Sequence, residues 1–539
     1  IKLRDGDKVL AHITAWPDKN KYPEGKIVEV LGARGDPGVD IRCIIKKYGL
    51  KEFFPKDVID EAQAISQAVK PEDLEGRRDL RDALMVTIDG DDAKDLDDAV
   101  SLVRTETGYR LGVHIADVSH YVKEESALNK EAMERGTSVY LVDRVMPMLP
   151  PELSNGICSL NAGVDRLAVS VLMDLDSEGE TKGYEIFKSV ILVKERMTYK
   201  DVNKILKEED PQLIDRYQEY VDMFRDMRDL AAIIRTKRFQ RGALDFDFPE
   251  AKIILDEKGV PLAIEKRIQD VAESLIEEFM IRANEVVALH LYKLEIPTLY
   301  RVHEKPDEDG ITNISKFLTL FNRQLPRGEV NPGVLQKVLT EIKGQPEERI
   351  ISTMILRSMK HARYTPAPLG HFGLASPYYL HFTSPIRRYP DLIVHRGLSY
   401  ILEKGSLAAK KKSAWEKSMP VTGEQCTVRE MGAEEAERDS VRLKMAEYMK
   451  DYVGEIFDGV ISSITAFGFF VELENLVEGL VHISALADDY YYFDDRQLIL
   501  IGKHTRKIYR IGDPVRVQLI KVNVDEGKLD FEPDYGYTH

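Results

Sequence analysis

The densest group of chemically active side chains lies in TIDGDDAKDLDDAV, residues 87–100, where six carboxylates fall within ten residues. They are Asp89, Asp91, Asp92, Asp95, Asp97 and Asp98. Six neighbouring negative charges repel one another and cannot all stay ionised beside a protein core unless cations neutralise them. Because no Cys or His stands nearby, the ligands would be hard oxygen atoms, which Mg²⁺ and Mn²⁺ prefer. The segment therefore predicts a divalent-metal site, with a solvated acidic turn as the alternative.

Two apolar runs flank this cluster directly, ALMVTI at 83–88 and AVSLV at 99–103. Both have the composition of buried β-strands. The carboxylates should therefore lie where strands end, which is where binding sites gather in α/β sheets. This position favours the metal site over the solvated turn.

A second candidate group lies in HFTSPIRRYPDLIVHR, residues 381–396, where Arg387 and Arg388 follow Pro385 at the start of a predicted helix. Two guanidiniums and helix N-terminal amides can hold a phosphate together. Structural ion pairing with Asp391 is the alternative. An acidic metal site and an arginine clamp together suit phosphoryl transfer. The chain contains no Walker A, HExxH or GxSxG sequence, which argues against P-loop, zincin and serine-hydrolase chemistry.

The hydrophobic patterns between and around these groups indicate the elements that position them. Period-2 runs predict strands, and i, i+3, i+4 spacing predicts long helices. The strands are expected at 83–88, 97–103, 109–118, 167–175 and 184–193, and the helices at 208–238, 265–293 and 424–453. Together they predict a mixed α/β domain over 68–450, C-terminal helices included. The charged segment 71–82 has no periodicity, which suits a linker.

Short alternating runs separated by Gly, Pro and Asp turns flank this domain on both sides. They occupy residues 1–67, including KVLAHITAW, KIVEVLG and VDIRCIIKK, and residues 451–535. Such runs predict a small OB-type β-barrel at each end. The expected fold class is thus a multidomain α+β chain.

Length and composition agree with several soluble domains. The 539 residues exceed what one hydrophobic core supports, and no segment approaches the roughly 20 apolar residues needed to cross a bilayer. The three cysteines, Cys43, Cys158 and Cys426, are far apart, which argues against a disulfide framework or a structural zinc site. The N-terminus lacks a signal-peptide pattern. We therefore expect a soluble, cytoplasmic protein.

The formal net charge of −16 argues against a nucleic-acid partner only if the charge is spread evenly. Residues 1–70 carry 13 basic and 11 acidic side chains, whereas residues 451–539 carry 8 and 16. The acidic excess is therefore local, and the charge does not exclude a nucleic acid.

Three stretches resemble the signature sequences of the ribonuclease II/ribonuclease R family of exoribonucleases. They are residues 87–100, TSVYLVDRVMPMLPPELSNGICSLN at 137–161, and residues 381–396. RRYPDL and LSNGICSLN resemble the ribonuclease R branch more closely. The resemblance implies a cold-shock-like OB barrel over 1–67, an RNB-type catalytic domain over 68–450 and an S1-like barrel over 451–535. It also implies a channel that admits one RNA strand from its 3′ end.

The resemblance also implies roles for individual residues. Asp89, Asp95, Asp97 and Asp98 would hold two Mg²⁺ ions, which Mn²⁺ could replace, while Asp91 and Asp92 fall outside the motif. Asp97, Arg387 and Glu437 would be catalytic, with Arg387 holding the scissile phosphate and Glu437 lying near the 3′ end. The RNA-binding residues would be Tyr140, which stacks on the terminal base, Arg387, Arg388, Phe467, Phe470 and His482. Ile253 appears where relatives often carry a second base-clamping aromatic.

The function that follows is metal-dependent 3′-to-5′ hydrolysis of single-stranded RNA to nucleoside 5′-monophosphates, extended to structured RNA with a 3′ overhang. We expect a monomer that needs no nucleotide cofactor and no membrane. The alternative is a non-catalytic RNA-binding protein that keeps the same architecture. The intact set of four aspartates favours the enzyme, because a binding module has no need of uncompensated acids beside RNA.

Overall fold

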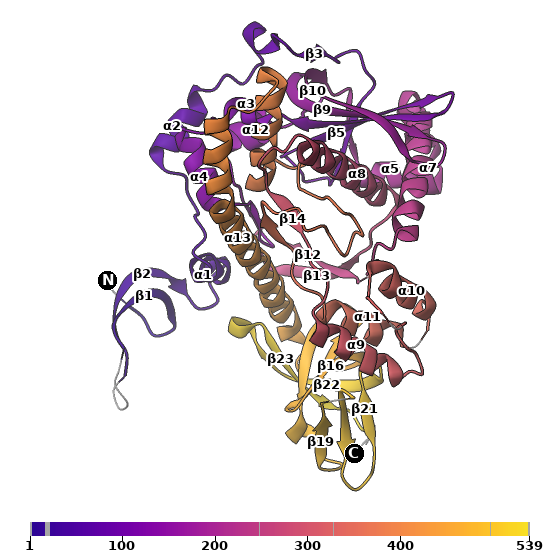
Figure 1. The fold of residues 1–539 in the computed structure, drawn as a ribbon. Coiled ribbons are helices and arrows are strands. Elements are labelled where there is room, and N and C mark those ends of the chain that lie inside the picture. Colours follow the sequence, from indigo (N-terminus) through magenta and orange to yellow (C-terminus); the bar gives the residue numbers. More distant parts are fainter. Residues whose placement is uncertain are drawn as a thin grey trace.

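The computed structural model describes residues 3–16, 22–246, 248–326, 328–345, 347–495 and 497–536. Its largest part is an α/β domain, with a β-hairpin module at the N-terminus and a β-barrel at the C-terminus (Figure 1). None of the helices in these ranges has the length and apolar character needed to span a lipid bilayer.

A seven-stranded sheet forms the centre of the α/β domain, in the order β11-β4-β5-β6-β9-β10-β3. The strands are β3 (Arg78–Asp79), β4 (Val86–Asp89), β5 (Asp98–Thr105), β6 (Gly108–Ala116), β9 (Asp165–Asp176), β10 (Thr181–Leu192) and β11 (Glu195–Thr198). The pairs β11–β4 and β10–β3 are parallel, and the other neighbours are antiparallel. All five strands predicted for this domain are confirmed.

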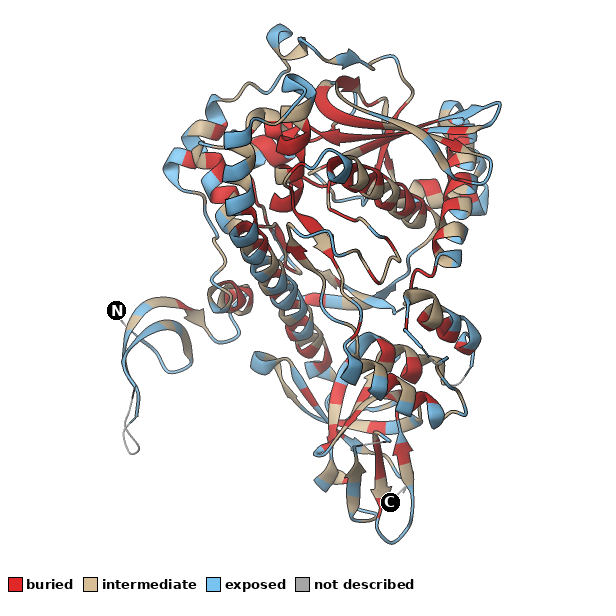
Figure 2. Cartoon of the chain, in the orientation of Figure 1, coloured by how far each residue is buried: buried red, intermediate tan, exposed pale blue. Residues whose placement is uncertain are grey.

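Two long helices, α7 (Gln218–Gln240) and α8 (Val271–Lys293), share one continuous core with this sheet. The core is the most strongly buried part of the molecule (Figure 2). Helix α8 begins later than predicted, because residues 261–267 form strand β13 and Asp270 then caps the helix in a capping box with Glu273. The 208–238 helix is divided into α6 (Pro211–Arg216) and α7.

The remaining elements of the domain lie around the sheet, except α9, α10 and α11, which share a hydrophobic cluster with the C-terminal barrel. The helices are α3 (Val118–Tyr121), α4 (Ala127–Arg135), α5 (Tyr199–Asn203), α9 (Glu308–Thr319), α10 (Pro332–Ile342), α11 (Glu348–Arg357), α12 (Tyr389–Lys404) and α13 (Ala409–Met449). The strands are β7 (Val139–Tyr140), β8 (Val145–Met146), β12 (Glu250–Leu255), β13 (Pro261–Arg267), β14 (Tyr300–Val302) and β15 (Arg363–Thr365).

The segment 71–82, which the sequence predicts as a linker, is built into the domain. It contains a 3₁₀ turn at Pro71–Leu74 and strand β3, which pairs with β10. The side chain of Arg77 is almost fully buried. The linker prediction is therefore wrong, because a pattern without periodicity does not reveal that a charged side chain has a buried partner.

The N-terminal module consists of the antiparallel pair β1 (Asp7–Ala15) and β2 (Glu24–Ala33), followed by α1 (Val39–Lys47) and α2 (Lys56–Ala64). The described residues of this module form two strands and no closed barrel. Segment 39–47 was predicted as a strand and is a helix. Its Ile41, Ile44 and Ile45 have helical spacing and pack in a core with α13, which overrides the partial alternation.

The C-terminal region is a closed barrel, as predicted. Its strands are β16 (Ile456–Thr465), β17 (Gly468–Leu473), β18 (Glu478–His482), β22 (Pro514–Asn523) and β23 (Lys528–Pro533). A three-stranded sheet is inserted, made of β19 (Tyr491–Asp494), β20 (Ile499–Gly502) and β21 (Ile508–Arg510).

Helix α13 connects the three parts of the molecule (Figure 1). Its 41 residues begin earlier than the predicted helix, since the basic stretch before residue 424 is also helical. Ala433 and Ala436 pack against α1, and Ala446 and Met449 belong to the core that fills the barrel. The N-terminal hairpin also contacts the C-terminal region through Asp525, which pairs with Lys8 and Arg34.

Candidate active site

The predicted carboxylates lie at one edge of the central sheet. Strand β4 ends at Asp89, β5 begins at Asp98, and the connecting loop carries Asp95 and Asp97. The side chain of Asp97 is 4% exposed, and its Oδ1 accepts a hydrogen bond from the backbone N–H of Ile386 at 2.8 Å. This bond joins the acidic segment to the 381–396 segment, nearly 300 residues later in the chain.

The carboxylates are placed where their ionisation is unfavourable. Burial and the neighbouring charge of Asp98 raise the pKa of Asp89, and burial raises the pKa of Asp98. Burial also raises the pKa of Asp97, although Arg387 opposes this. The Oδ2 atoms of Asp89 and Asp97 are buried and have no hydrogen-bond partner among the described residues. The site therefore holds acceptor atoms that the protein itself leaves unsatisfied.

These atoms fit the requirements of a hard divalent cation. Such cations take carboxylate oxygens, and their charge would relieve the repulsion that raises these pKa values. Asp89, Asp95, Asp97 and Asp98 are the residues that would hold the ion. Within the described ranges, however, no three acidic, His or Cys side chains already converge as a ligand set. Asp91 and Asp92 are exposed, in agreement with their place outside the motif.

Tyr140 and Arg387 lie beside the aspartates. The Tyr140 hydroxyl donates to Oδ2 of Asp95 at 2.9 Å. The Arg387 Nε lies 4.0 Å from Oδ2 of Asp97, and its side chain is 42% exposed. The backbone N–H of Ser138 donates to the Arg387 carbonyl at 2.9 Å, which holds the two segments together. The structure thus combines carboxylates, one aromatic ring and one accessible cation.

Arg388 has a different environment from Arg387. Its Nη2 donates to Oδ1 of Asp391 at 2.7 Å, and little of its side chain is exposed. Both residues precede α12, which has Pro390 in its first turn and ends at Gly405 in the left-handed conformation. The ion-pair alternative therefore describes Arg388, while Arg387 remains available to a ligand.

Glu437 is exposed on α13, and no hydrogen bond or ion pair of the described residues joins its carboxylate to the aspartates. Desolvation and the charges of Glu250 and Glu434 raise its pKa. Glu430, two turns earlier, pairs instead with Arg301 and accepts a hydrogen bond from the Tyr364 hydroxyl at 3.1 Å.

Tyr364 connects Glu430 to the segment 381–396, which carries Arg387 and Arg388. The Tyr364 hydroxyl also lies 2.8 Å from Nδ1 of His381, the first residue of that segment. Sequence reasoning missed Glu430, Arg301 and Tyr364. Glu430 and Glu437 are seven residues apart, which places them on nearly the same face of the helix. The sequence pattern alone therefore does not decide which of these two glutamates lies near the 3′ end of the RNA.

The predicted RNA-binding residues of the barrel lie together. Phe467 is 48% exposed, and its ring centroid lies 6.3 Å from that of the half-buried Phe470. Phe469 is buried, as alternation requires. Exposed His482 pairs across the sheet with Gly468, between the two rings in sequence. In the nearby basic run 503–510, Lys507 and His504 already pair with Asp488 and Asp489.

Ile253 is 9% exposed and pairs with Ile264 of β13, whereas Ile254 is more exposed. Both border a cavity of about 590 Å³ between the β12–β13 hairpin, residues 142–144 and Gly38 of the N-terminal module. Ile253, the residue that the resemblance singles out, is therefore the more buried of the two isoleucines.

Three family models match successive parts of the chain. The cold shock domain model matches residues 1–55, the RNB domain model residues 77–404, and the S1 RNA binding domain model residues 450–532. The N-terminal module is thus cold-shock-like, although its described residues form only a hairpin and helices. Fold and site together define an RNB-type ribonuclease.

Curated relatives specify the branch. Ribonuclease R of Thermotoga maritima is 47% identical over 535 residues, covering 98% of this chain and 75% of that protein. Ribonuclease R 1 of Lactococcus lactis is 46% identical, covering 97% and 64%. The chain belongs to the ribonuclease R family of exoribonucleases. It spans about two thirds to three quarters of the length of these relatives.

Solved structures show the same architecture. Mycoplasma genitalium RNase R in complex with ribose-methylated single-stranded RNA has a TM-score of 0.92 and 29% identity, covering 99% of this chain and 83% of that one. Yeast Ssd1, a pseudonuclease, shares the fold with a TM-score of 0.71 and 21% identity, covering 92% and 62%. Because this fold also occurs in a pseudonuclease, catalysis must be argued from the site.

Proposed function

We propose that this chain hydrolyses single-stranded RNA from the 3′ end to nucleoside 5′-monophosphates, and that it also degrades structured RNA with a 3′ overhang. The observation that carries the proposal is the pair of buried, unsatisfied carboxylate oxygens on Asp89 and Asp97, next to the accessible cation of Arg387. A pseudonuclease gains nothing from such atoms, because uncompensated acids weaken RNA binding.

The cofactor in this proposal is a pair of Mg²⁺ ions, which Mn²⁺ can replace. Bound there, divalent cations supply positive charge to the phosphoryl oxygens and acidify water. Carboxylates alone are the donor set that suits these hard ions. No nucleotide cofactor is required, and we infer that the protein works as a monomer in the cytoplasm.

The protein's own side chains then orient the substrate. Asp97 is held by the Ile386 N–H through Oδ1, so its Oδ2 keeps a fixed direction. Arg387 is free to bind the scissile phosphate and to stabilise its added charge during the reaction. Tyr140, anchored to Asp95 by its hydroxyl, offers a ring on which the terminal base can stack.

The direct test is a 5′-labelled single-stranded RNA incubated with Mg²⁺, with Mn²⁺ and with EDTA. We expect a ladder that shortens from the 3′ end in either metal, nucleoside 5′-monophosphates as products, and no cleavage in EDTA. A DNA of the same sequence is the control and should persist. Cleavage in EDTA or nucleoside 3′-phosphates as products would contradict the proposal.

The proposed RNA-binding role of the barrel has its own test, the double variant Phe467→Ala/Phe470→Ala. Stacking contributes roughly 1–3 kcal/mol per base, so the Kd for RNA should rise by about 30-fold or more. The single-turnover rate at saturating RNA should stay nearly unchanged. Tyr492→Ala, which removes an exposed aromatic on the inserted sheet, is the matched control for Kd. An unchanged Kd in the double variant would show that the two rings do not contribute to RNA binding.

A further inference from the structure

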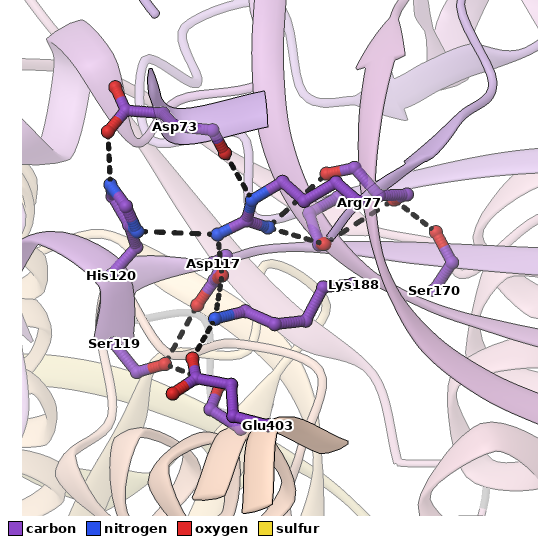
Figure 3. Close-up of polar contacts among 11 residues, drawn as sticks. Asp73, Arg77, Asp117, Ser119, His120, Ser170, Lys188 and Glu403 are labelled. Carbon is purple, nitrogen blue, oxygen red and sulfur yellow. Dashed lines mark hydrogen bonds and ion pairs between the residues drawn. The ribbon is translucent and has the colours of Figure 1, made fainter. Parts of the chain in front are cut away.

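A second buried cluster of charges surrounds Arg77 and Asp117 (Figure 3). Its centre is the ion pair between Arg77 Nη2 and Asp117 Oδ2, at 2.7 Å, with side chains 2% and 0% exposed. Arg77 comes from the segment before β3, and Asp117 follows the end of β6 directly. Neither residue belongs to the predicted catalytic set.

Every nitrogen of the Arg77 guanidinium has a partner. Nε donates to the Asp73 carbonyl at 2.9 Å, and Nη1 lies 3.4 Å from the carbonyls of Ala168 and Ser189, which face each other on β9 and β10. Nη2 also lies 3.3 Å from Nδ1 of His120. Arg77 is therefore fixed in position by strands β9 and β10, by the turn at Pro71–Leu74, and by Asp117 and His120, which follow β6.

Hydrogen bonds and ion pairs connect Asp117 to helix α12. Its Oδ1 accepts a hydrogen bond from Ser119 at 2.7 Å, and the Ser119 hydroxyl lies 3.1 Å from the hydroxyl of Ser399 on α12. Lys188 lies 3.9 Å from Asp117 and 2.6 Å from Glu403, which is also on α12 (Figure 3). Helix α12 begins directly after Arg387 and Arg388.

Asp117 is also linked to the acidic half of the site, through the residues that precede it on β6. The backbone N–H of Ala116, its neighbour in the chain, donates to the Asp97 carbonyl at 2.9 Å. Ile115 pairs with Asp98 across β5 and β6. The carboxylate segment and the helix that carries the arginine are thus both attached to one buried ion pair.

We propose that Arg77, acting through Asp117, is a positioning residue that sets the distance between Asp97 and Arg387 in the active site. This inference rests on the proposed catalytic roles of those two residues. Hydrolysis depends on this distance, because a displacement of about 1 Å between reacting groups can lower the rate by roughly 10²-fold. A buried ion pair is otherwise a weak source of stability, since apolar residues of similar size often replace it without loss.

The test compares Arg77→Met, Asp117→Leu and the double variant Arg77→Met/Asp117→Leu. Asp117→Leu leaves Arg77 without its buried counter-ion, and Arg77→Met leaves Asp117 with Lys188, 3.9 Å away, as its remaining cation. Each single variant should therefore lower the Tm strongly. The double variant removes both charges and should recover most of the Tm. Its single-turnover rate at saturating RNA should nevertheless stay roughly 10- to 100-fold below wild type, with the Kd for RNA changed less than about threefold.

The matched control is Arg238→Met/Glu278→Leu. This pair joins α7 to α8, is equally buried and has its charged atoms 2.6 Å apart. Its removal should leave the single-turnover rate at the wild-type value. A wild-type rate in the Arg77/Asp117 double variant, or an equal fall in the control, would overturn the proposal.

If the Arg77/Asp117 double variant does not fold, Ser119→Ala decides the question, because it removes the hydrogen bonds that connect Asp117 through Ser119 to Ser399 and keeps every charge. A fall of about threefold or more in its single-turnover rate supports the positioning role, and a wild-type rate overturns it. Asp97→Asn separates this result from the proposed function. Normal turnover in Asp97→Asn would overturn the function itself, whereas inactivity there with a wild-type rate in Ser119→Ala would overturn only the positioning.

Discussion

Asp97 and Asp117 are both buried carboxylates, and Ala116, the neighbour of Asp117, donates its backbone N–H to the Asp97 carbonyl, yet the surroundings of the two side chains are opposite. Asp117 is surrounded by Arg77, Lys188 and Ser119. Burial opposes its ionisation, but Arg77 and Lys188 outweigh burial and hold its pKa below the usual range. Asp97 has one backbone donor, an unsatisfied Oδ2 and a pKa that burial raises.

The carboxylate of Asp117 is thus satisfied by partners within the protein, whereas Oδ2 of Asp97 is not and is available to a ligand. A protein that only needed stability would pair both groups. Functional sites typically keep buried acids without partners, as at Asp97, close to acids that are fully paired, as at Asp117. Local stability at such sites is lower than it could be.

Asp97→Asn should lower the rate of RNA cleavage by at least ~10³-fold while RNA still binds, because the amide keeps the shape and loses the charge. Single-turnover cleavage and a filter-binding Kd measure the two quantities. Asp91→Asn, in the same loop but exposed, is the control and should cleave at the wild-type rate. Ordinary turnover in Asp97→Asn would remove the distinction between the two carboxylates.

The same substitution should have opposite effects on stability at the two positions. In EDTA, Asp117→Asn should lower the free energy of unfolding by about 3 kcal/mol, because Arg77 and Lys188 lose their buried counter-ion. Asp97→Asn should raise it by about 1 kcal/mol, because a disfavoured buried charge is removed. Urea denaturation of both variants at pH 7.5 measures these changes. Destabilisation by Asp97→Asn would show that its carboxylate is already satisfied.

The pH dependence of stability should reveal the carboxylates whose pKa is raised by burial, Asp89, Asp97 and Asp98. The pKa of Asp89 is raised to about 8, so between about pH 4 and pH 8 the folded state binds more protons than the unfolded state. In EDTA the free energy of unfolding should therefore fall with rising pH, by up to about 1 kcal/mol per unit from this group.

Asp89→Asn should flatten this fall between pH 5 and pH 8, and Asp91→Asn should leave it unchanged. Asp117 contributes in the opposite sense and at lower pH, because its stabilising charge is lost only when acid protonates it. An Asp89→Asn slope equal to wild type would assign the pH dependence to other groups.

The sequence predicted the elements around the site better than the contacts within it. Strands β4, β5, β6, β9 and β10 follow from alternation and apolar runs, because the sheet buries both of its faces. The Asp97–Ile386 hydrogen bond does not follow, since it joins segments nearly 300 residues apart and depends on how the whole domain closes. The aspartates could be predicted from the sequence because six acidic side chains within ten residues cannot all stay ionised beside a protein core.

Arg77 and Asp117 were not found, because each looks like an ordinary charged residue until its partner is known. Helix α1 was mistaken for a strand because Val39 and Ile41 alternate, while its helical contacts lie on α13, far away in the sequence. In both cases the missing information was a long-range partner, which local spacing does not contain.

Helix α13 has a consequence for how this architecture can be recombined. The family match to the S1 domain begins at residue 450, but the hydrophobic interior of the barrel already includes Ala446 and Met449 at the end of the helix. A truncation at residue 450 therefore removes residues that belong to the hydrophobic interior of the barrel. Over roughly 60 Å, at 1.5 Å per residue, one continuous helix contributes to the packing of the first module, the catalytic domain and the last. A graft of the barrel onto another protein should carry the last turns of α13 with it, because the inherited unit is longer than the domain that sequence similarity delimits.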